Sequence, residues 1–480
     1  MAPTEVKLFK DPVHGYIPVE RALCEAFIDQ PIFQRLRHIE QTSMRPLYPG
    51  AHHDRFIHSL GVYRLARIVL GHLTCPPESV SDSEWNTLTR SFEIACLMHD
   101  CGHAPFSHTC EHFYNYSDTE NARRRAEHWL LSLVDEDFKK DIHGVPVAEH
   151  ETFSAALLID TYRDVVTKLG GDVYLAARMI TGCRFASASE PFKQLANCFI
   201  ELLNGTAIDL DKLDYIIRDT WASGVKNTAV DVDRLLSAVK IKPTRITYRV
   251  CFHKSALSVI RSVVDARNYL FEWIYNHHTV VYYAELLKAA LLQLAKGFAT
   301  DDNPDHFWEA VFSAHPFREP VELAQGVHIY LPADGDLMHL LKARSQKPEF
   351  AMVNELLSHN PSRIPLWKTY GEFKLMCDLN NINDMHNTEA ARARIPVMLA
   401  KHCGNNHSKE DFVVIEAKSR TACIEANGIM VDMGEDEPVS YTEIYGKEVP
   451  QLRRFFYVFV PKAYSSRIDE LRDEVCRVFV

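Results

Sequence analysis

The residues best suited to chemistry lie in one short stretch, Leu97 to His108, which reads LMHDCGHAPFSH. It follows an apolar run typical of a buried helix and carries three imidazoles and one carboxylate, from His99, Asp100, His103 and His108. Neutral imidazole and carboxylate groups are suitable ligands for divalent Mn, Fe, Zn or Mg. The adjacent His99 and Asp100 supply only two ligands, so a metal site requires at least two more from elsewhere in the chain.

Two other predicted helices can supply those ligands. In the stretch 52–70, Arg55 and His58 are three residues apart and therefore lie on one helix face. The polar face of the stretch 208–219 carries Asp211, Lys212, Tyr215 and Asp219. A lone histidine is more often a core residue than a ligand, and a charged helix face usually contacts solvent. Together, however, the segments offer four ligands and leave positions open for water and substrate: His58, His99, Asp100 and Asp211.

The elements that must position these side chains are mainly helical. We expect a mainly α fold, with a helical catalytic domain over residues 1–300 and a smaller α+β lobe over residues 301–480. Helical periodicity also covers the stretch 256–298. Alternation, apolar runs and turn residues predict strands or hairpins at 7–17, 245–252, 412–415 and 455–460.

A further helix is predicted over residues 31–40, with Asp29 as its N-cap and Pro31 in its first turn. Its apolar stripe comprises Ile32, Leu36 and Ile39. Its opposite face carries Gln34, Arg35, Arg37 and Glu40. Such a charged face is usually solvated.

Composition excludes several classes of protein. The 480 residues are 46% hydrophobic and 24% charged, which is ordinary for a globular chain. The first residues lack the apolar core of a secretory signal, and no apolar run reaches the roughly 18 residues of a membrane span. The 12 cysteines are irregularly spaced without a Cys-x-x-Cys pair, as expected for buried thiols in a reducing compartment. The net charge of −11 disfavours nucleic-acid binding. From the signal, the apolar runs and the cysteines we expect an intracellular protein of the cytoplasm or nucleus that binds no membrane.

The chain carries a series of short motifs in a fixed order: Phe33-Gln34-Arg35-Leu36-Arg37, Pro49-Gly50-Ala51, Arg55-Phe56, His58-Ser59-Leu60-Gly61-Val62, His99-Asp100, Gly102-His103, Pro105-Phe106-Ser107-His108, and Ile208-Asp209 followed by Asp211-Lys212. This series resembles the HD-domain phosphohydrolases, and most closely the SAM-and-HD-domain deoxynucleoside triphosphate triphosphohydrolases, here without the SAM domain. The resemblance is strongest over residues 7–280. It implies water attack on the α-phosphorus of a dNTP, with release of a deoxynucleoside and inorganic triphosphate.

The resemblance also implies roles for individual residues. One divalent metal (Fe, Mn, Zn, Ni or Mg) would be held by His58, His99, Asp100 and Asp211, and Mg²⁺ would accompany the nucleotide triphosphates. Phosphate contacts are implied for Arg55, His103, His108, Lys212 and Arg267. The resemblance also implies a catalytic role for His108 and a substrate contact for Tyr215. His150, followed by Glu151, matches a histidine that protonates the leaving 5′ oxygen. Glu111 stands where the family has an aspartate that orients this histidine, and either acid would raise the pKa of the imidazole.

Sugar and base recognition follow from the same resemblance. Gln41 and Asp219 match residues that hold the 3′-hydroxyl, and Tyr275 matches a tyrosine packed where a 2′-hydroxyl would lie. Two departures concern the base: Phe271 replaces a histidine, and Thr42 replaces a leucine in a loop that is one residue shorter. The preferred base is therefore not predicted.

The resemblance further implies nucleotide activators bound between subunits. The guanine-nucleotide site is matched by Lys7, Leu8, Asp29, Gln34, Arg37 and, in the C-terminal lobe, Arg363. In a neighbouring deoxynucleotide site Arg234 and His277 are kept, whereas Lys10 stands for an asparagine, His253 for an arginine and His278 for a lysine. We expect a homo-oligomer, from dimer to tetramer, activated by GTP with or without a dNTP.

Two other functions compete with this prediction. One is an HD phosphodiesterase or nuclease, which the net charge and the retained Gln41, Asp219 and Tyr275 disfavour. The other is a non-catalytic nucleotide-binding protein with a structural metal. His150 and Lys212 disfavour this second alternative, since neither is needed to hold a metal.

Overall fold

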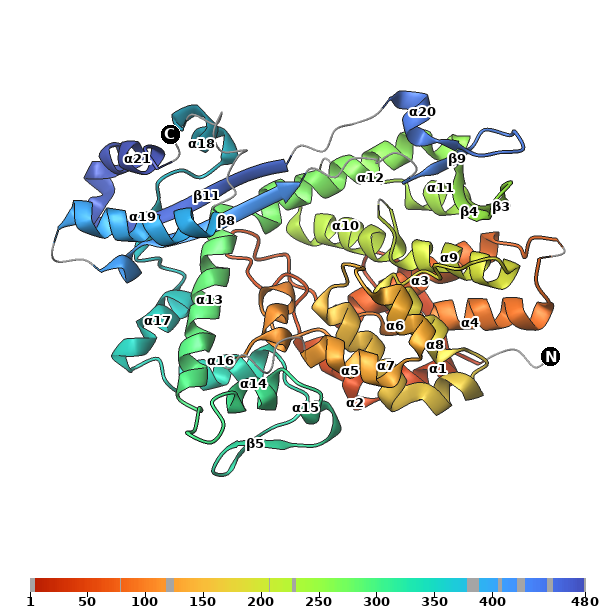
Figure 1. The fold of residues 1–480 in the computed structure, drawn as a ribbon, viewed down its shortest axis with the longest axis horizontal. Coiled ribbons are helices and arrows are strands. Elements are labelled where there is room, and N and C mark those ends of the chain that lie inside the picture. Colours follow the sequence, from red (N-terminus) through yellow and green to blue (C-terminus); the bar gives the residue numbers. More distant parts are fainter. Residues whose placement is uncertain are drawn as a thin grey trace.

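The computed structural model describes residues 5–77, 79–117, 125–206, 208–226, 230–377, 388–404, 408–420, 428–446 and 452–478. Helices dominate the described residues, and the strands form small separate sheets. Helices from the first half of the chain gather at one end of the elongated molecule, and most of the teal and blue C-terminal elements gather at the other (Figure 1). The predicted mainly α fold with a minor share of β structure is confirmed.

Three helices carry or precede the predicted metal ligands: α3 (Arg55–His72), α4 (Asp82–Met98) and α10 (Leu210–Ser223). Helix α3 packs against both of the others. Each begins at a side chain that accepts a hydrogen bond from the first turn, namely Asp54, Ser81 and Asp209. These caps fix where each helix begins, and thereby where its ligand-bearing turn lies.

A layer of further helices buries this group: α5 (Arg125–Leu133), α6 (Glu136–Ile142), α7 (Glu149–Lys168), α8 (Val173–Thr181) and α9 (Pro191–Leu203). Helix α4 packs on α7, α8 and α9. Its last apolar turns, from Phe92 to Met98, are fully buried among them. His99 and Asp100 therefore leave the helix inside the molecule, where a polar group needs a partner.

The stretch 256–298 is not one continuous helix. It comprises α12 (Leu257–Leu270), a π-helical turn over Phe271–Tyr275, and α13 (His278–Lys296), which begins at the cap residue His277. Helix α11 (Val232–Ser237) packs on α3 and α12. Periodicity predicted the helices but not the interruption, because a π-helical turn adds a residue without removing the apolar pattern.

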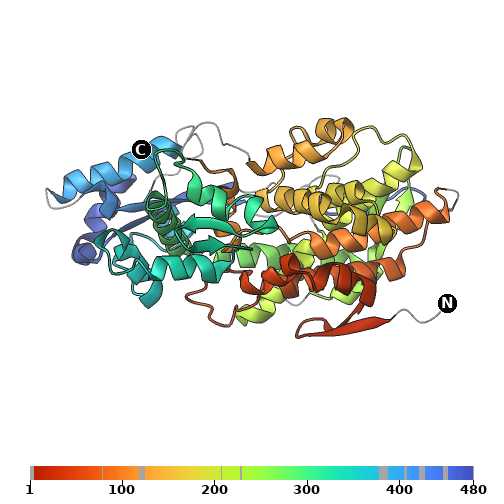
Figure 2. The same cartoon turned by 90° about the horizontal axis from the view of Figure 1, so that it is seen from below.

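The predicted N-terminal hairpin is confirmed. Strand β1 (Val6–Asp11) pairs antiparallel with β2 (Gly15–Glu20), and Gly15 adopts a φ of +74° in the connecting turn. Figure 2 shows the hairpin, in red, at the edge of the molecule. A short helix, α1 (Arg21–Leu23), follows it.

The helix predicted over 31–40 is wrong in two respects. Helix α2 covers only Pro31–Gln34, and a 3₁₀ turn over Arg35–His38 continues it. Its N-cap is Gln30, because Asp29 instead pairs with Lys7 of the hairpin, 2.9 Å away. Arg35, expected on a solvated face, is buried and donates hydrogen bonds to two backbone carbonyls.

The C-terminal stretch combines short helices with sheets. Its helices are α14 (His306–Val311), α15 (His315–Arg318), α16 (Asp334–Lys342), α17 (Ala351–Ser358), α18 (Tyr370–Met376), α19 (Thr388–Cys403), α20 (Tyr441–Tyr445) and α21 (Ile468–Cys476). Its sheets are β5 (Val321–Ala324) with β6 (Val327–Ile329), and the antiparallel set β7 (Arg363–Pro365), β11 (Leu452–Pro461) and β8 (Val413–Arg420). The strands predicted at 412–415 and 455–460 are confirmed.

One sheet joins distant parts of the chain. Strands β3 (Val239–Pro243) and β4 (Tyr248–His253) form a hairpin, of which β4 corresponds to the strand predicted at 245–252. Strand β9 (Met430–Asp432) adds to β4 in parallel and pairs on its other side with β10 (Val439–Ser440). The chain thus returns to its first half after residue 428, and the domain boundary at residue 300 stays a prediction.

Two general expectations can be compared with the structure. Cys377 and Cys476 form a disulfide between the ends of α18 and α21, which differs from the thiols expected in a reducing compartment. The other described cysteines are free, and most are buried as expected. Within the described residues, no helix has the length and apolar character that crossing a membrane requires.

Candidate active site

The four predicted metal ligands converge between α3, α4 and α10. His58 and Asp211 project from the first turns of their helices, and His99 and Asp100 follow the end of α4. His58 Nε2 lies 3.0 Å from Asp211 Oδ1, 3.4 Å from His99 Nε2 and 3.6 Å from Asp100 Oδ2. The ligand atoms of a tetrahedral zinc ion, with bonds of about 2.1 Å, are about 3.4 Å apart. The spacing of His58, His99 and Asp211 therefore fits one divalent ion, and Asp100 lies beside both histidines.

Charge in this cluster favours a cation. Burial raises the pKa of Asp100, but Arg55 and the nearby histidines outweigh burial and hold that pKa well below its usual value. Burial also opposes ionisation of Asp211, yet hydrogen bonds from two histidines keep its pKa well below normal. Burial lowers the pKa of His58, but hydrogen bonds to Asp211 and Asp214 raise it to about 9. Two ionised carboxylates facing imidazole nitrogens form a site that a divalent ion would occupy in place of protons.

Partners outside the cluster orient both imidazoles. His99 Nδ1 lies 3.0 Å from the carbonyl oxygen of Cys96, and His58 Nδ1 lies 2.8 Å from Asp214 Oδ2. Each histidine therefore presents Nε2 to the shared point. This is the usual way in which a partner at one ring nitrogen fixes a metal-binding imidazole.

Asp214 is itself held by distant residues that sequence reasoning missed. Its Oδ1 lies 2.6 Å from Nε2 of His14, which comes from the turn of the N-terminal hairpin. Arg218 donates to both of its oxygens and also to Asp11. A Cβ at Gly61 of α3 would overlap this carboxylate, so the close approach requires glycine. His14 is 200 residues from Asp214 in sequence, and no local pattern connects them.

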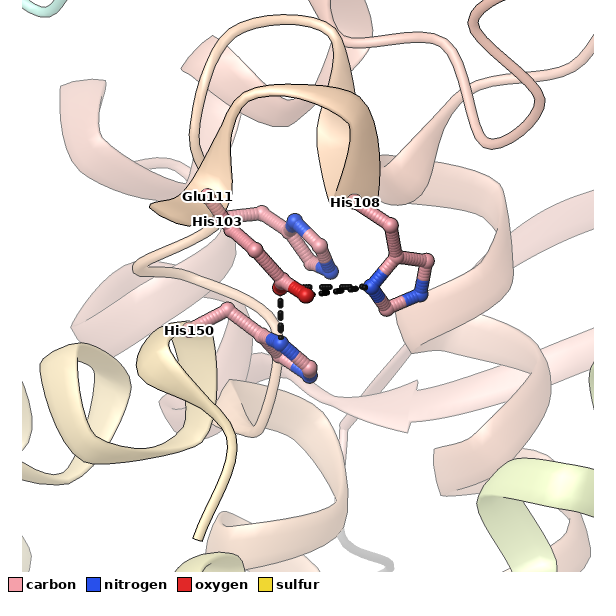
Figure 3. Close-up of side chains that lie close together, drawn as sticks. All are labelled: His103, His108, Glu111 and His150. Atoms are coloured by element: carbon pink, nitrogen blue, oxygen red, sulfur yellow. Dashed lines mark hydrogen bonds and ion pairs between the residues drawn. The ribbon is translucent and has the colours of Figure 1, made fainter. Parts of the chain in front are cut away.

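A second cluster contains His103, His108, Glu111 and His150 (Figure 3). Glu111 accepts hydrogen bonds from Nδ1 of His150, at 2.7 Å, and of His108, at 3.2 Å. The His103 ring stacks on that of His150, with centroids 4.1 Å apart and an interplanar angle of 15°. His150 Nε2 lies 4.0 Å from Asp100 Oδ1, so the two clusters adjoin.

The two stacked imidazoles differ in protonation. Burial lowers the pKa of His150, but Glu111 outweighs burial and raises it to about 9. Burial and, next, the charge of Arg55 lower the pKa of His103 well below its usual value. Although burial opposes its ionisation, the pKa of Glu111 is held far below normal by the histidines it binds. At neutral pH, His150 is therefore an imidazolium and His103 is neutral.

The geometry of this second cluster suits proton transfer better than a metal. An imidazole binds a metal in the plane of its ring, and the nearly parallel rings of His103 and His150 cannot aim two lone pairs at one point. Glu111 is already engaged by two histidines. His103 is fully buried, and neither of its ring nitrogens has a hydrogen-bond partner among the described residues. Its ring nitrogens are therefore free to contact a bound ligand.

A cavity of about 490 Å³ opens on both clusters. It is lined by most of the predicted substrate and catalytic residues: Gln41, Thr42, Arg55, His108, Glu111, His150, Glu151, Asp211, Lys212, Tyr215, Asp219, Phe271 and Tyr275. Its lining also includes the apolar residues Met44, Val280, Val281 and Ala284. This volume lies within the range typical of small-molecule sites.

Hydrogen bonds organise the residues matched to the sugar. Tyr275 donates to Asp219, whose other carboxylate oxygen lies 2.7 Å from His53 Nε2. Burial and the Asp219 charge raise the pKa of Tyr275 well above normal, so the phenol stays protonated. Gln41 Oε1 is buried without a hydrogen-bond partner in the described part of the chain. His53 had not been singled out from the sequence, and adjacency to another histidine was its only signal.

The predicted phosphate-binding cations are held at the cavity by acids. Arg55 Nη1 donates to Asp100 Oδ2 at 2.7 Å, whereas its Nη2 is buried and has no partner in the described ranges. Lys212 pairs with Asp209, the N-cap of α10, and also donates to the Gly205 carbonyl at 2.9 Å. Both cations are therefore fixed near the metal cluster.

Arg267 lies behind the cavity lining. Its Nε donates to the Tyr215 hydroxyl at 3.2 Å, and its guanidinium lies 4.9 Å from the centre of the Phe271 ring. Phe271, which departs from the family pattern, thus serves as a platform for this cation.

Glu151, predicted as part of the catalytic group, has mainly structural contacts. It accepts a hydrogen bond from Ala148 N at 3.0 Å, which caps α7, and another from Asn204 Nδ2 at 3.0 Å. Burial raises its pKa. Among the described residues, the hydrogen-bonded acid partner of His150 is Glu111.

The residues matched to the guanine-nucleotide site are not all brought together in one chain. Lys7 and Asp29 pair at the surface, Leu8 is exposed, and Arg37 Nε donates to Gln34 Oε1 at 2.9 Å. Arg363 instead lies on β7, where it donates to the Asp411 carbonyl at 2.7 Å.

Among the residues matched to the second nucleotide site, Arg234 and His253 both contact Ser255. Lys10 lies over the Tyr16 ring, and Arg234 donates to the Ser255 carbonyl. The rings of His277 and His278 are 4.1 Å apart and line a separate cavity of about 250 Å³.

Several known proteins are similar to this chain. No family model matches the chain. An uncharacterized protein YwfO of Bacillus subtilis is 27% identical over 68% of this chain and 66% of its own length. The deoxynucleoside triphosphate triphosphohydrolases SAMHD1 of Gallus gallus and Danio rerio are 24% and 28% identical, over 99% and 57% of this chain. The matched stretch spans 72% and 42% of those two proteins.

Solved structures share the fold. A phosphohydrolase from Bacteroides thetaiotaomicron superposes with a TM-score of 0.64 over 95% of this chain and 100% of its own, at 18% identity. A hypothetical protein from Aquifex aeolicus gives 0.61 over 98% and 100%, at 19% identity. The relatives and the arrangement of these residues are consistent with the HD-domain phosphohydrolases, and two deoxynucleoside triphosphate triphosphohydrolases are among the proteins to which the chain is similar.

Proposed function

We propose that this protein is a metal-dependent dNTP triphosphohydrolase, converting a dNTP and water to a deoxynucleoside and inorganic triphosphate. The observation that carries the proposal is the pairing of two clusters in one cavity. A four-ligand metal cluster adjoins a protonated histidine whose Nε2 is 4.0 Å from Asp100 Oδ1. Phosphate-ester hydrolysis by water is favoured by this combination of an electrophilic centre and an acid for the leaving oxygen.

Each residue has a defined task in this reaction. A divalent ion held by the four ligands supplies Lewis acidity and a more acidic water. As the water oxygen bonds to the α-phosphorus, the bond to the 5′ oxygen breaks, and that oxygen takes the proton from His150 Nε2. Glu111 binds the Nδ1–H of His150, which keeps the ring oriented and stabilises its charged form. The water loses its proton to solvent, and His150 regains one from solvent.

Cations and N–H groups would stabilise the negative charge of the departing triphosphate. Arg55, Lys212 and Arg267 supply the positive charge, and neutral His103 supplies an N–H. Arg55 Nη2 and both His103 ring nitrogens are buried without hydrogen-bond partners among the described residues. Such orphaned groups are costly in an empty site, and a bound triphosphate would satisfy them.

Selection of deoxyribose is proposed to depend on Tyr275 and Asp219. Their hydrogen bond holds the phenol ring in the cavity wall, where a 2′-hydroxyl would meet it. Tyr275→Ala should therefore raise the ratio of GTP to dGTP hydrolysis by about tenfold. An unchanged ratio of GTP to dGTP hydrolysis would contradict a role for Tyr275 in selecting deoxyribose.

The base is proposed to contact a largely apolar wall. Met44, Val280, Val281, Ala284 and Phe271 offer shape and dispersion rather than hydrogen bonds. We therefore expect hydrolysis of more than one dNTP.

Activation by GTP or dNTPs and assembly from dimer to tetramer are proposed from the resemblance. The separation of Arg363 from Lys7 and Arg37 within one chain supports a site completed by a second copy. Mg²⁺ would enter with the nucleotides. Light scattering with GTP and dNTPs should show an increase in mass together with an increase in rate, and no change in either would contradict this part of the proposal.

The reaction itself is tested by its products. Purified protein is incubated with each dNTP, with and without GTP, and phosphate species are resolved by anion exchange. Inorganic triphosphate and deoxynucleoside in equal amounts would support the proposal. Pyrophosphate with a monophosphate would contradict it. Hydrolysis of a cyclic nucleotide or oligonucleotide instead would favour the phosphodiesterase alternative, and nucleotide binding without turnover would favour a non-catalytic role.

A further inference from the structure

Asp334, at the start of α16, reaches two segments of the active site from a distant part of the chain. Its Oδ1 accepts a hydrogen bond from Phe106 N at 2.6 Å, and its Oδ2 accepts one from Glu40 N at 3.0 Å. These residues are 228 and 294 positions away in sequence. Gln41 directly follows Glu40, and His108 lies two residues after Phe106, so one carboxylate joins two walls of the cavity.

The backbone that Asp334 binds has a conformation that non-glycine residues rarely adopt. Phe106 and Ser107 have φ angles of 60° and 51°, in the left-handed region. Neither side chain favours this region, so surrounding contacts must hold it. Asp334 binds the Phe106 N–H, while Ser107 Oγ donates to the Glu40 carbonyl at 2.5 Å and accepts from Arg55 Nε at 3.1 Å.

Arg35 makes a second connection between the same two regions. Its Nε donates to the Pro332 carbonyl and its Nη2 to the His103 carbonyl, both at 2.7 Å. The side chain is buried, and its guanidinium lies 4.7 Å from the centre of the Phe317 ring. The segment 332–334 is therefore tied to both His103 and Phe106, the residues that flank the Ala104-Pro105 step.

We propose that Asp334 is a positioning residue of the active site, which clamps the Phe106–Ser107 turn to Glu40 so that His108 and Gln41 face one cavity. Through this clamp the C-terminal part of the chain would control the geometry of the site. A carboxylate suits the task because it accepts two backbone N–H groups at once. An asparagine accepts one and sets its own N–H₂ against the other. The catalytic readout of this inference rests on the proposed function.

The test compares Asp334→Asn with Asp336→Asn in the Mn²⁺-loaded full chain. Asp336 is a matched control because it lies in the same helical turn and accepts from Ala333 N at 2.9 Å. Hydrogen–deuterium exchange, kcat, KM and metal content are measured for both. For Asp334→Asn we expect exchange at 39–42 and 104–109 to be at least fivefold faster and kcat to be at least tenfold lower, with metal content unchanged. Asp336→Asn should change neither the exchange rates nor kcat.

Unchanged exchange in both segments of Asp334→Asn, or an equal loss of turnover in Asp336→Asn, would overturn the proposal. If Asp334→Asn does not fold, Asp334→Ser is read by the same criteria, since a hydroxyl accepts one N–H and can turn its own hydrogen away from the other. If the wild-type protein hydrolyses no dNTP, the proposed function fails, whereas the exchange data still decide the role of Asp334.

Discussion

His58 and His150 lie in adjacent clusters and have the same kind of partner at Nδ1. Asp214 Oδ2 is 2.8 Å from His58 Nδ1, and Glu111 Oε2 is 2.7 Å from His150 Nδ1. Against the opposing effect of burial, Asp211 and Asp214 together raise the pKa of His58 to about 9, and Glu111 raises the pKa of His150 to about 9. The difference lies at Nε2. Nε2 of His58 faces Asp211, His99 and Asp100 within 3.6 Å. Nε2 of His150 lies 4.0 Å from the Asp100 carboxylate, and its ring stacks on that of His103.

This difference shows how one arrangement of residues can serve two kinds of chemistry. A carboxylate at Nδ1 makes an imidazole a better base and fixes its tautomer. Where other donors surround Nε2, the lone pair binds a cation. Where Nε2 faces a cavity, the same lone pair holds a proton for a substrate. Variants that change one cluster should therefore leave the other intact.

Asp211→Ala has the largest expected effect. It removes one of four ligands and one ionised carboxylate, so the metal content should fall to below one-tenth of the wild-type value and triphosphate release should fall by about 10³-fold or more. Elemental analysis and product assays measure both. Asp233→Ala, which removes an exposed acid from the first turn of α11, is the matched control. If Asp211→Ala retained the metal, the assignment of Asp211 as a metal ligand would be contradicted.

Glu111→Gln should lower kcat by about 100-fold while the metal stays bound. In the wild-type protein the protonated form of His150 persists at neutral pH and is lost as pH rises through about 9. Without the Glu111 charge, the proton is lost nearer the ordinary value of 6.5. The alkaline limb of the kcat profile should therefore move to lower pH. Bound metal shifts this limb in both proteins, so the difference between them is the test. Coincident profiles would contradict the role of Glu111.

Asp214→Asn should have a smaller effect, and one that added metal reverses. It weakens the orientation of His58, so metal affinity should fall by about 10- to 100-fold. Excess Mn²⁺ should restore most of kcat in Asp214→Asn and none in Glu111→Gln. The variant also leaves the buried Arg218 with less negative charge, and its free energy of unfolding should fall by about 3 kcal/mol in urea titrations. If excess Mn²⁺ did not restore kcat in Asp214→Asn, the proposed difference between the two clusters would be contradicted.

Residue types, their spacing and short motifs predicted many residues of the candidate site. Residue types and spacing on three predicted helices predicted four metal ligands, of which the structure groups His58, His99 and Asp211 closely enough to hold one ion. Asp100 lies within 3.6 Å of both histidines, and its role as a ligand stays a prediction. Resemblance of motifs paired His150 with Glu111, and the structure has them 2.7 Å apart. The N-terminal hairpin and the C-terminal strands followed from turn residues and apolar runs.

Partners that are distant in sequence could not be predicted. Arg35 was expected on a solvated face, yet it is buried because carbonyls 297 and 68 residues away accept its hydrogen bonds. Asp214 and His14 meet across 200 residues, and Asp334 meets Glu40 across 294. Such contacts arise from tertiary packing, which leaves no periodic trace in either segment.

The central claim is that the first cluster binds the metal and that His150 of the second cluster supplies the acid. The most direct test is His150→Ala, assayed for metal content and triphosphate release in one preparation. One divalent ion per chain should remain bound and kcat should fall by about 10²- to 10⁴-fold, because only the acid is lost. Full turnover, or loss of the metal together with activity, would contradict it.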